Sequence, residues 1–325
     1  MPYDPTYHLL WRADKVRAAV REARPDVLEI HSPYVAAIAC LSVPRRDFGI
    51  RTFFWHSDFI DTYRRVLLSR VPRSEDLVRP LWRWVRRVGR ACDLTIAATA
   101  IQRDKLRAHG VPEVELVPIG VDKDVFRPEA RDPTRRAALL EGDDVLLVAV
   151  GRFAVEKRWD VVLDAHRRLR DAGVRARLAL FGDGPERARL ERLAGPGARF
   201  FGFEKDRASL ASALASADAL VHGCPHETFG ATIAEAIACG TPVVVPDEGG
   251  AGEQARGNRA ARAYATGDAA ACAAAIRDTL AMAPEARRAA AAEARARVAS
   301  VRGHFERTLE LYVDRLARAR AERVC

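Results

Sequence analysis

The chain has 325 residues, 49% of them hydrophobic and 30% charged, which suits two globular domains and excludes a disordered or fibrous protein. No apolar segment is long enough to cross a bilayer, and six scattered cysteines without a C-x-x-C pair predict reduced thiols and no transition-metal site. The net charge of +9 comes almost entirely from arginine and fits an anionic substrate or an anionic membrane surface; it is a weak argument for nucleic acid, which we do not expect as a partner.

The first part of the chain alternates helical and strand patterns, which predicts an α/β domain with parallel strands. It starts with Met1-Pro2-Tyr3-Asp4, which lacks the basic and apolar regions of a secretory signal, so we expect a cytoplasmic protein. The expected helices cover residues 12–22, 34–41, 80–90 and 102–109, and the expected strands cover 27–30, 51–55, 94–97 and 115–118.

The arginine-rich helix near residues 80–90 has two interpretations. Apolar side chains fall on one of its faces and arginines on the other. A basic amphipathic helix can lie on an anionic membrane, which would place the protein peripherally at the inner face of the membrane. A helix packed into the core with a solvated arginine face has the same pattern. The apolar residues are Leu81, Trp84, Val85 and Val88.

The second part predicts a Rossmann-like domain, because strand-like runs alternate with amphipathic helices on both sides of a parallel sheet. Residues 120–133 read as a linker between domains. A helical run follows Pro284, and its apolar residues predict a terminal helix that packs back on the first domain. We therefore expect one domain of residues 1–122 with 303–325, and a second of 123–302. The expected strands are 145–150, 177–181, 199–203, 219–222 and 242–245, the expected helices are 159–171, 185–193, 207–217 and 229–239, and the apolar residues of the terminal helix are Phe305, Leu309, Tyr312, Val313 and Leu316.

Two carboxylates bracket the start of the helix at 229–239. Glu227 falls on the turn from strand to helix, and Glu235 lies just over two helical turns further on. One carboxylate can face a sugar while the other reaches a ribose. Phe229 and Gly230 begin the helix, whose free N–H groups and positive dipole end suit a phosphate or a sugar hydroxyl.

Two cations and two glycines follow neighbouring strands of the same domain. Arg152 and Lys157 can converge on a diphosphate, one with a forked contact and one as a point charge, without a metal. Gly182 and Gly184 form a turn of small residues that allows the backbone to approach a nucleotide.

At these positions the chain resembles the glycogen-synthase-like, or group 1, family of retaining glycosyltransferases. The resemblance covers about residues 90–300, and 26–61 more loosely. It implies an α/β GT-B fold in which two Rossmann-like domains face a cleft. In that family the residues matching Arg152 and Lys157 bind the donor diphosphate, the residue matching Glu227 contacts the transferred sugar, and the residue matching Glu235 holds the ribose.

The resemblance also assigns residues in the first domain. Family members carry a histidine that faces the donor sugar, and His56 matches it at the end of a strand. It therefore joins Glu227 as a candidate catalytic residue, with Asp58 as a helper. Ile119-Gly120-Val121-Asp122 resembles the hinge motif of the family. No metal and no other cofactor is expected.

The chain departs from the family in two places. Arg158 replaces the glycine that normally follows the lysine. The first strands and glycine-rich loop of relatives do not precede Asp26, so we expect an incomplete first domain, through a late start site or a reduced form.

Simpler interpretations stand beside these. Glu227 and Glu235 can be a helix cap and an exposed helical residue, Arg152 and Lys157 plain surface charges, and His31 or His56 a hydrogen-bonded histidine at a strand end. Asp122-Lys123-Asp124 matches a D-x-D metal motif, but it falls in the linker with a lysine between the acids, so we reject it as a metal site.

The sequence thus predicts a metal-independent, retaining hexosyltransferase that moves a sugar from GDP-mannose or a UDP-sugar to a hydroxyl on a glycan or lipid-linked acceptor. The strings EIHSPY and FWHSD look most like bacterial mannosyltransferases. The alternatives are a non-catalytic or truncated nucleotide-sugar-binding protein, a nucleotide-sugar epimerase of the same fold, or a phosphorylase, for which Lys157 is the only well-placed Schiff-base candidate.

Overall fold

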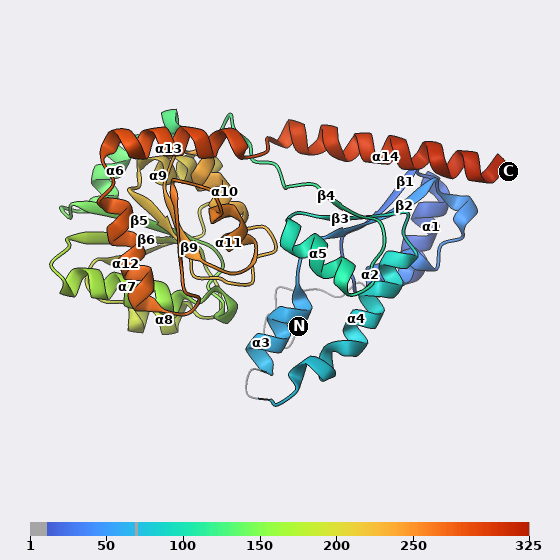
Figure 1. Cartoon of the computed structure of the whole chain (residues 1–325), viewed down its shortest axis with the longest axis horizontal. Coiled ribbons are helices and arrows are strands. Elements are labelled where there is room, and N and C mark those ends of the chain that lie inside the picture. Colours follow the sequence, from blue (N-terminus) through green and yellow to red (C-terminus); the bar gives the residue numbers. More distant parts are fainter. Residues whose placement is uncertain (1–11, 69–70, 325) are drawn as a thin grey trace. The chain divides into compact units, whose positions relative to one another are not determined.

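The computed structural model describes residues 12–68 and 71–324. The chain divides into two compact units (Figure 1). One contains the described residues up to Pro118 and those from Arg302 onward, and the other is Ile119–Val301. Each unit has its own parallel sheet and its own hydrophobic core. The α/β class with two parallel sheets, as predicted from the sequence, is confirmed.

The first unit is built on a four-stranded sheet in the order β1-β2-β3-β4. All neighbouring strands are parallel, so their carboxyl ends lie at one edge. The elements are α1 (Ala13–Ala23), β1 (Val27–Ile30), α2 (Val35–Leu41), η1 (Arg45–Asp47), β2 (Ile50–Trp55), α3 (Phe59–Leu67), α4 (Ser74–Arg90), β3 (Leu94–Ala97), α5 (Ala100–Ala108), β4 (Val114–Leu116) and α14 (Val301–Val324).

Helix α4 begins six residues before the range expected from the sequence. Pro80 therefore lies inside α4, although proline lacks the N–H that a helix interior needs. Glu75 and Asp76 occupy the first turn, where carboxylates interact favourably with the helix dipole.

Side chains of β2 alternate between two environments, as strand geometry requires. The ring of Trp55 faces α4, where it lies 6.0 Å from the ring of Trp82. Phe54 and His56 face the other side of the sheet, where the ring of Phe54 lies 6.0 Å from that of His304 on α14. Figure 1 shows α14 and α5 on opposite sides of this sheet.

Helix α14 packs on the first unit with a face that overlaps only partly with the expected one: Tyr312 is buried and Leu316 half-buried as expected, but the other three expected residues are exposed. The Tyr312 hydroxyl donates to Glu29 Oε1 at 2.5 Å, and Arg315 pairs with Glu113 at 2.6 Å. These contacts turn the helix by about 100°, the angle between successive residues, away from the expected stripe. The buried residues include Thr308, Leu311 and Tyr312, whereas Phe305, Leu309 and Val313 are 57%, 58% and 66% exposed.

The second unit contains a six-stranded parallel sheet in the order β10-β9-β8-β5-β6-β7. Figure 1 shows α9, α10 and α13 above it and α7 and α8 below it. The elements are η2 (Pro128–Ala130), α6 (Pro133–Leu140), β5 (Val145–Val150), η3 (Val155–Lys157), α7 (Trp159–Asp171), β6 (Ala176–Phe181), α8 (Arg187–Leu193), β7 (Ala198–Gly202), α9 (Arg207–Ser216), β8 (Ala219–Val221), α10 (Ala231–Ala238), β9 (Val243–Pro246), α11 (Gly249–Ala255), β10 (Ala261–Tyr264), α12 (Ala269–Leu280) and α13 (Pro284–Arg297).

The strand order reverses between β5 and β8, which flank the centre of this sheet. In open α/β sheets, ligands bind beyond the carboxyl ends of the strands at such a point. The loops that follow β5 and β8 are therefore the part of this unit where a functional site is expected.

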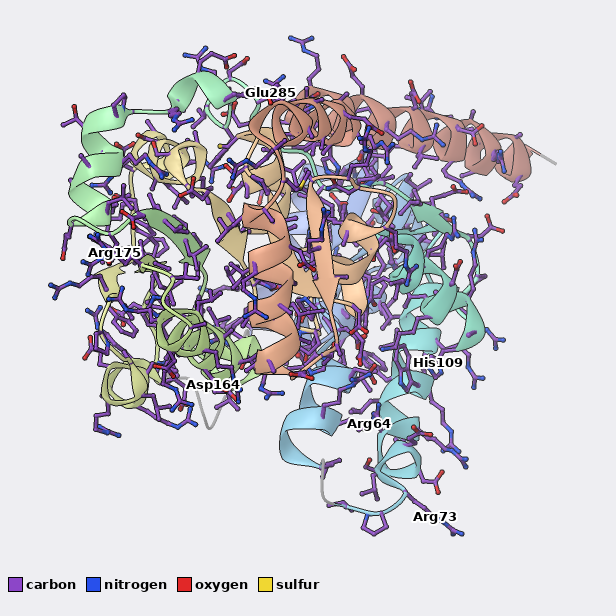
Figure 2. The ribbon with its side chains drawn as sticks, turned by 60° about the vertical axis from the view of Figure 1, so that its left-hand side comes forward. Arg64, Arg73, His109, Asp164, Arg175 and Glu285 are labelled. Atoms are coloured by element: carbon purple, nitrogen blue, oxygen red, sulfur yellow. The ribbon has the colours of Figure 1, made fainter. Side chains whose placement is uncertain are left out.

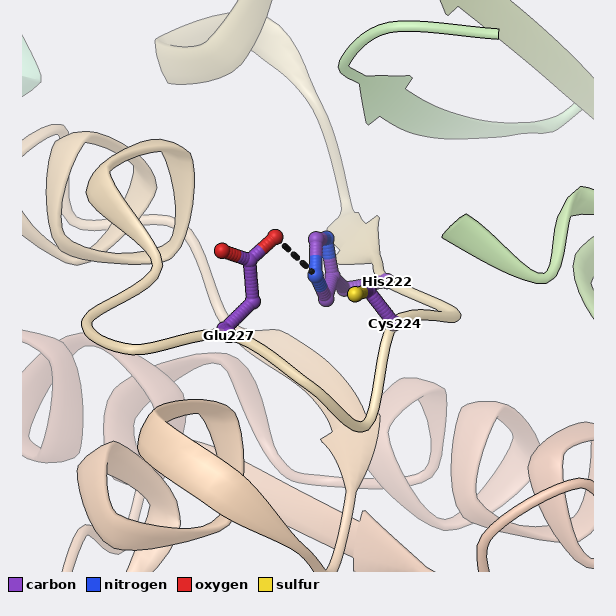
Figure 3. A group of neighbouring side chains, drawn as sticks. All are labelled: His222, Cys224 and Glu227. Atoms are coloured by element: carbon purple, nitrogen blue, oxygen red, sulfur yellow. Dashed lines mark ion pairs between the residues drawn. The ribbon is translucent and has the colours of Figure 1, made fainter. Parts of the chain in front are cut away.

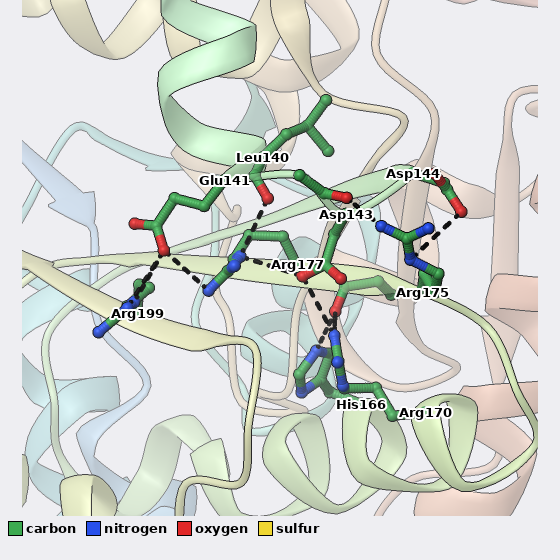
Figure 4. A network of polar contacts seen from close by, with 11 residues as sticks. Leu140, Glu141, Asp143, Asp144, His166, Arg170, Arg175, Arg177 and Arg199 are labelled. Atoms are coloured by element: carbon green, nitrogen blue, oxygen red, sulfur yellow. Dashed lines mark hydrogen bonds and ion pairs between the residues drawn. The ribbon is translucent and has the colours of Figure 1, made fainter.

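The opposite, amino edge of this sheet carries a network of ion pairs (Figure 4). Arg177, at the start of β6, pairs with Glu141 and Asp143 at 3.2 Å each and donates to the carbonyl of Leu140 at 3.2 Å. Arg170 also pairs with Asp143, at 3.1 Å. Because Arg177 is almost fully buried, the network holds α6, the helix before β5, against the sheet. It lies at the end of the strands opposite to their carboxyl ends.

Candidate active site

The loops after β5 and β8 meet through a buried ion pair. Lys157 ends the short helix η3, and its ammonium group contacts Glu227 Oε1. Both side chains are mostly buried, with 23% and 16% exposed. Gly223 allows this approach, because a Cβ there would lie 2.7 Å from the carbonyl oxygen of Lys157. Two of the residues predicted from the sequence are thus brought together.

The surroundings of Glu227 keep its carboxyl group ionised. Burial raises the pKa of this group, but the charge of Lys157 and the hydrogen bond from His222 outweigh burial and hold the pKa well below its usual range. His222 Nε2 lies 3.2 Å from Glu227 Oε1. Lys157 shows the reverse balance: burial lowers its pKa, but Glu227 more than compensates, so the pKa rises and the ammonium stays charged.

His222, Cys224 and Glu227 form a group that offers three metal-ligating atoms within 4.8 Å of one another (Figure 3). The sequence spacing gave no sign of it. Burial raises the pKa of the Cys224 thiol to about 12, so the thiolate that a metal requires is disfavoured. The ammonium of Lys157 already neutralises the carboxylate. The same three residues can therefore serve a metal only if Lys157 moves away.

The backbone around Glu227 is set by two glycines at the start of α11. Gly249 has φ +62, and a Cβ there would lie 2.4 Å from the carbonyl oxygen of Pro225. A Cβ on Gly250 would lie 2.9 Å from backbone atoms of Phe229, and its N–H donates to the Glu227 carbonyl at 2.7 Å. Side chains at either position would displace the turn that carries the carboxylate.

Helix α10 begins next to this turn. Its N-cap is Gly230, which has φ +87, a conformation that glycine adopts at little cost. Phe229 is buried, and its carbonyl accepts a hydrogen bond from the Gln254 side chain. The first N–H groups of α10 lack partners within the helix and carry its positive dipole end, which suits a phosphate oxygen.

Arg152 follows β5 directly, but its guanidinium is turned along its own loop. It donates to Glu156 Oε1 at 2.7 Å, and its carbonyl accepts from Trp159 Nε1 at 2.8 Å. Its expected role at a diphosphate remains a prediction.

Glu235 lies on α10 and is paired with a residue that the sequence did not single out. Arg207, at the start of α9, donates to Glu235 Oε1 at 3.2 Å and lies 4.8 Å from the centre of the Phe126 ring. Burial raises the pKa of the Glu235 carboxyl, and Arg207 offsets only part of this effect. The expected role of Glu235 at a ribose remains a prediction.

Gly182 and Gly184 are required by contacts inside the protein. Gly182 has φ +145, and a Cβ there would lie 1.9 Å from the carbonyl oxygen of Gly151. Gly184 has φ +156, and a Cβ there would lie 2.5 Å from the carbonyl oxygen of Phe153. The turn after β6 therefore packs tightly on the loop that leads to Lys157. The expected contact with a nucleotide remains a prediction.

Arg158, which replaces a family glycine, has φ +48. This left-handed conformation explains why glycine suits the position. The guanidinium points to Asp160, with Nε 3.1 Å from Oδ1.

In the first unit, His56 lies at the carboxyl end of β2 in a cluster of aromatic rings. Phe54 stacks on it with centroids 4.1 Å apart, and its Nε2 contacts Nδ1 of His31. His31 Nε2 lies 3.3 Å from Glu29 Oε2. Burial and the neighbouring His31 lower the pKa of His56 to about 4, so the ring is neutral near pH 7.

Asp58 does not assist His56. It is buried and caps α3, where its Oδ1 accepts from the N–H of Asp61 at 3.2 Å. Its other oxygen contacts the ammonium of Lys105 and accepts from Gln102 at 3.4 Å. These partners lie on α5, on the side of β2 opposite to His56, so a role as helper is wrong for this structure.

Sequence reasoning missed His222, Arg207, Glu29, His304 and Tyr312 as members of these clusters. His222 had a signal, since it lies five residues before Glu227 at the end of a predicted strand, and Tyr312 was expected to pack on the first domain, though not as a hydrogen-bond donor to Glu29. The contacts of Arg207 with Glu235 and of Tyr312 with Glu29 join residues 28 and 283 positions apart, which one sequence does not reveal.

The fold and the site define a class: two parallel α/β units, one of which carries paired carboxylates and cations at the carboxyl edge of its sheet. Solved structures of this class are similar to the chain. Sucrose-phosphate synthase from Thermosynechococcus elongatus matches with a TM-score of 0.80, 21% identity, and coverage of 97% of this chain and 82% of that structure. Anabaena Alr3699/HepE in complex with UDP and glucose matches with a TM-score of 0.75, 17% identity, and coverage of 93% and 81%. The fold is GT-B.

The family models "Glycosyl transferases group 1" and "Glycosyltransferase Family 4" match residues 130–297 and 1–125. The chain belongs to the group 1 glycosyl transferase family. It is 36% identical, over 75% of its length, to the GDP-mannose-dependent alpha-(1-6)-phosphatidylinositol dimannoside mannosyltransferase of Mycobacterium tuberculosis. The chain spans about three-fifths of the length of the curated relatives that it matches, 63% in this case.

Proposed function

We propose that this protein is a metal-independent, retaining glycosyltransferase that moves a sugar from a nucleoside-diphosphate donor to a hydroxyl acceptor. The observation that supports this most directly is the buried Lys157–Glu227 pair at the start of α10. It brings a cation for a diphosphate, a carboxylate for sugar hydroxyls and a helix N-terminus to one edge of the family-matched unit.

The ion pair between Lys157 and Glu227 can stay intact when a nucleotide-sugar binds. An ammonium group has three N–H donors, so Lys157 can keep its contact with Glu227 while it donates to a phosphate oxygen. Charge on the leaving diphosphate grows as the glycosidic bond breaks, and a fixed cation in a partly buried site stabilises that charge most. Lys157 would thus supply what a metal ion supplies in other transferases.

We further propose GDP-mannose as the donor, because several relatives that are 30–36% identical to this chain are GDP-mannose-dependent mannosyltransferases. UDP is the nucleotide in one structural neighbour, but that likeness is at 17% identity and concerns the fold. The nucleotide is therefore the first property to test.

The binding test is the thermal shift of the purified chain with GDP, GDP-mannose, UDP and UDP-glucose. A ligand that binds only the folded state stabilises it in proportion to RT ln(1 + [L]/Kd). We expect GDP and GDP-mannose to stabilise the wild type, and Lys157→Met or Glu235→Ala to remove most of the shift. Arg167→Ala and Glu293→Ala, exposed charges on α7 and α13, are matched controls that keep it. Equal shifts in site and control variants would refute the donor site.

The transfer test follows release of GDP from GDP-mannose with a lipid-linked mannoside acceptor, and the anomeric configuration of the product. We expect an α-linked product, which is retention, and the same rate with and without EDTA. Binding without release of GDP in the presence of acceptors would instead identify a non-catalytic nucleotide-sugar-binding protein.

We also propose that the acceptor is presented at an anionic membrane surface next to α4. None of the helices in residues 12–68 and 71–324 is long and apolar enough to cross a membrane. On α4, however, Leu77 and Leu81 are 58% and 37% exposed. Helices α3 and α4 border an open groove of about 470 Å³ whose lining includes Arg79, Arg83 and Arg86 together with the acidic residues Asp61, Glu75 and Asp76. Figure 2 labels two further residues of this lining, Arg64 and His109. Exposed leucines beside arginines suit anionic lipid.

Sedimentation with vesicles tests this contact. We expect the chain to bind phosphatidylglycerol vesicles at low salt and to leave phosphatidylcholine vesicles in solution. Leu77→Ser with Leu81→Ser should weaken binding, whereas Leu309→Ser, an exposed leucine on α14, should not. Equal losses in both variants would show that the effect is not located on α4.

A further inference from the structure

The side of the first sheet that carries His56 also carries a chain of polar groups that ends on α14. Parallel pairing sets Ile30 opposite Phe53, so Glu29 and His31 leave β1 on the same side as Phe54 and His56 leave β2. Tyr312 reaches this side from α14 and donates to Glu29 at 2.5 Å. The order of contacts is Tyr312, Glu29, His31, His56.

We propose that Tyr312, Glu29 and His31 are positioning residues that fix the His56 ring as the tautomer with its proton on Nδ1, so that His56 meets substrate as a hydrogen-bond donor and not as a base. The role toward substrate rests on the proposed transferase function; the tautomer does not.

The geometry determines where the protons lie. A carboxylate only accepts hydrogen bonds, so His31 must carry a proton on Nε2 to bond Glu29. When His31 is charged it also carries a proton on Nδ1, which it donates to His56 Nε2. A neutral imidazole has one N–H, and with Nε2 accepting, the proton of His56 is on Nδ1.

The titration of the groups facing His56 agrees with this order. The hydrogen bond to Glu29 raises the pKa of His31. Burial raises the pKa of Glu29, but the hydrogen bonds from His31 and Tyr312 outweigh it, so Glu29 stays ionised. His304 on α14 also lies on this side, and its Nδ1 donates to the Pro118 carbonyl at 2.9 Å.

A tautomer switch follows from the same bonds. As pH rises through the raised pKa of His31, that ring loses a proton. It retains the Nε2 proton for Glu29, so its bare Nδ1 becomes an acceptor. His56 must then donate from Nε2, and its Nδ1 loses the proton. The donor at Nδ1 is therefore present at low pH and lost at high pH.

The test is the tautomeric state of each ring in long-range ¹H–¹⁵N spectra of the full chain labelled with [¹⁵N]histidine, with His56 assigned from His56→Asn. At pH 6 we expect Nδ1–H on His56 in the wild type. In Glu29→Gln, His31 should titrate at least one pH unit lower, and His56 should carry its proton on Nε2 at pH 6. Tyr312→Phe, which keeps the ring, should shift His31 in the same direction by less.

Two controls separate this role from a general effect on packing. Glu113→Gln removes the ion pair that Glu113 forms with Arg315 of α14, and so loosens the packing of this helix. It should nevertheless leave the histidine spectra unchanged. His166, whose Nε2 bonds the Ala176 carbonyl at 2.8 Å, must carry its proton there in every variant. Nε2–H on His56 in the wild type at pH 6 would overturn the proposal, as would His31 titrating alike in wild type, Glu29→Gln and Tyr312→Phe.

Because the spectra need no turnover, failure of the transferase assay leaves this test intact. If transfer is observed, kcat/KM should fall at high pH as His31 loses its proton. In Glu29→Gln this fall should occur at a lower pH, by the same number of pH units as the titration of His31 is lowered. A fall at the same pH in both would show that the tautomer of His56 does not matter to the reaction.

Discussion

The Lys157–Glu227 pair allows stability and donor binding to be tested with the same variants. Both side chains are less than a quarter exposed, so removing one partner leaves the other charge uncompensated in a poorly solvated site. Breaking a buried pair in this way costs about 3–5 kcal/mol. In both single variants His222 remains, with its Nε2 3.2 Å from Glu227 Oε1 in the wild type.

A double-mutant cycle measures the coupling. We expect Lys157→Met and Glu227→Met each to lower the free energy of unfolding by about 3–5 kcal/mol, and the double variant by less than about 2 kcal/mol, because no charge is then left unpaired. For a unit of this size, 3 kcal/mol corresponds to a fall in Tm of about 6–12 °C, measurable by calorimetry. GDP binding should be lost in all three variants, since each lacks a residue of the donor site.

The pH dependence has a defined sign. The folded-state pKa of Glu227 is held below that of the unfolded chain, so its contribution is complete above about pH 5 and is lost as pH falls toward the folded-state value. The difference in unfolding free energy between wild type and Glu227→Met should therefore shrink below about pH 5. Additive losses in the double variant, or a difference that grows on acidification, would refute the interpretation of the pair.

Other substitutions test the backbone, the ion network and the metal question. Gly182→Ala should lower the unfolding free energy by about 1–3 kcal/mol, because its Cβ would lie 1.9 Å from Gly151 O, whereas Gly195→Ala, with open space around it, should be neutral in the same denaturation assay. Arg158→Gly should raise the unfolding free energy by up to about 1 kcal/mol. The left-handed conformation costs residues other than glycine about 1–2 kcal/mol, and the exposed ion pair between Arg158 and Asp160 contributes less than this cost. Arg177→Met should cost about 3–5 kcal/mol, against less than about 0.5 for the exposed Arg175→Met. EDTA should leave GDP affinity unchanged in calorimetric titration, and recovery by Zn²⁺ of a loss caused by EDTA would contradict the absence of a metal.

The sheet of the second unit could be predicted well because its strands are nearly continuous apolar runs, as parallel strands buried on both faces require. The ranges 145–150 and 159–171 agree residue for residue with β5 and α7. The edge strand β10 and helix α6 were not predicted. Helices α11 and α12 were not predicted either. Helix α11 begins with two glycines that serve contacts with the Glu227 turn, and α12 is an alanine-rich segment without a clear polar face.

The candidate site could be predicted as a set of residues but not as a set of pairs. Motif order identified Lys157, Glu227 and Glu235, yet the partner of each depends on how separate loops fold. Arg207 reaches Glu235 from another helix, and His222 approaches Glu227 from the end of β8. The packing face of α14 was predicted only in part for the same reason. Sequence periodicity identifies an apolar stripe on a helix, whereas contacts such as the hydrogen bond from Tyr312 to Glu29 decide which face packs on the sheet.

The pairing of charges fixes the side chains of the proposed donor site. Arg152, Lys157 and Glu235 each already contact an opposite charge. These pairs hold the side chains in position before a ligand arrives, which is the condition for electrostatic stabilisation without reorganisation. A diphosphate must then add to the pairs and not replace them. Lysine suits this because its three donors point in different directions from one atom, whereas the planar fork of arginine would commit to the carboxylate. Lys157→Arg should therefore preserve the pair with Glu227 but weaken GDP binding.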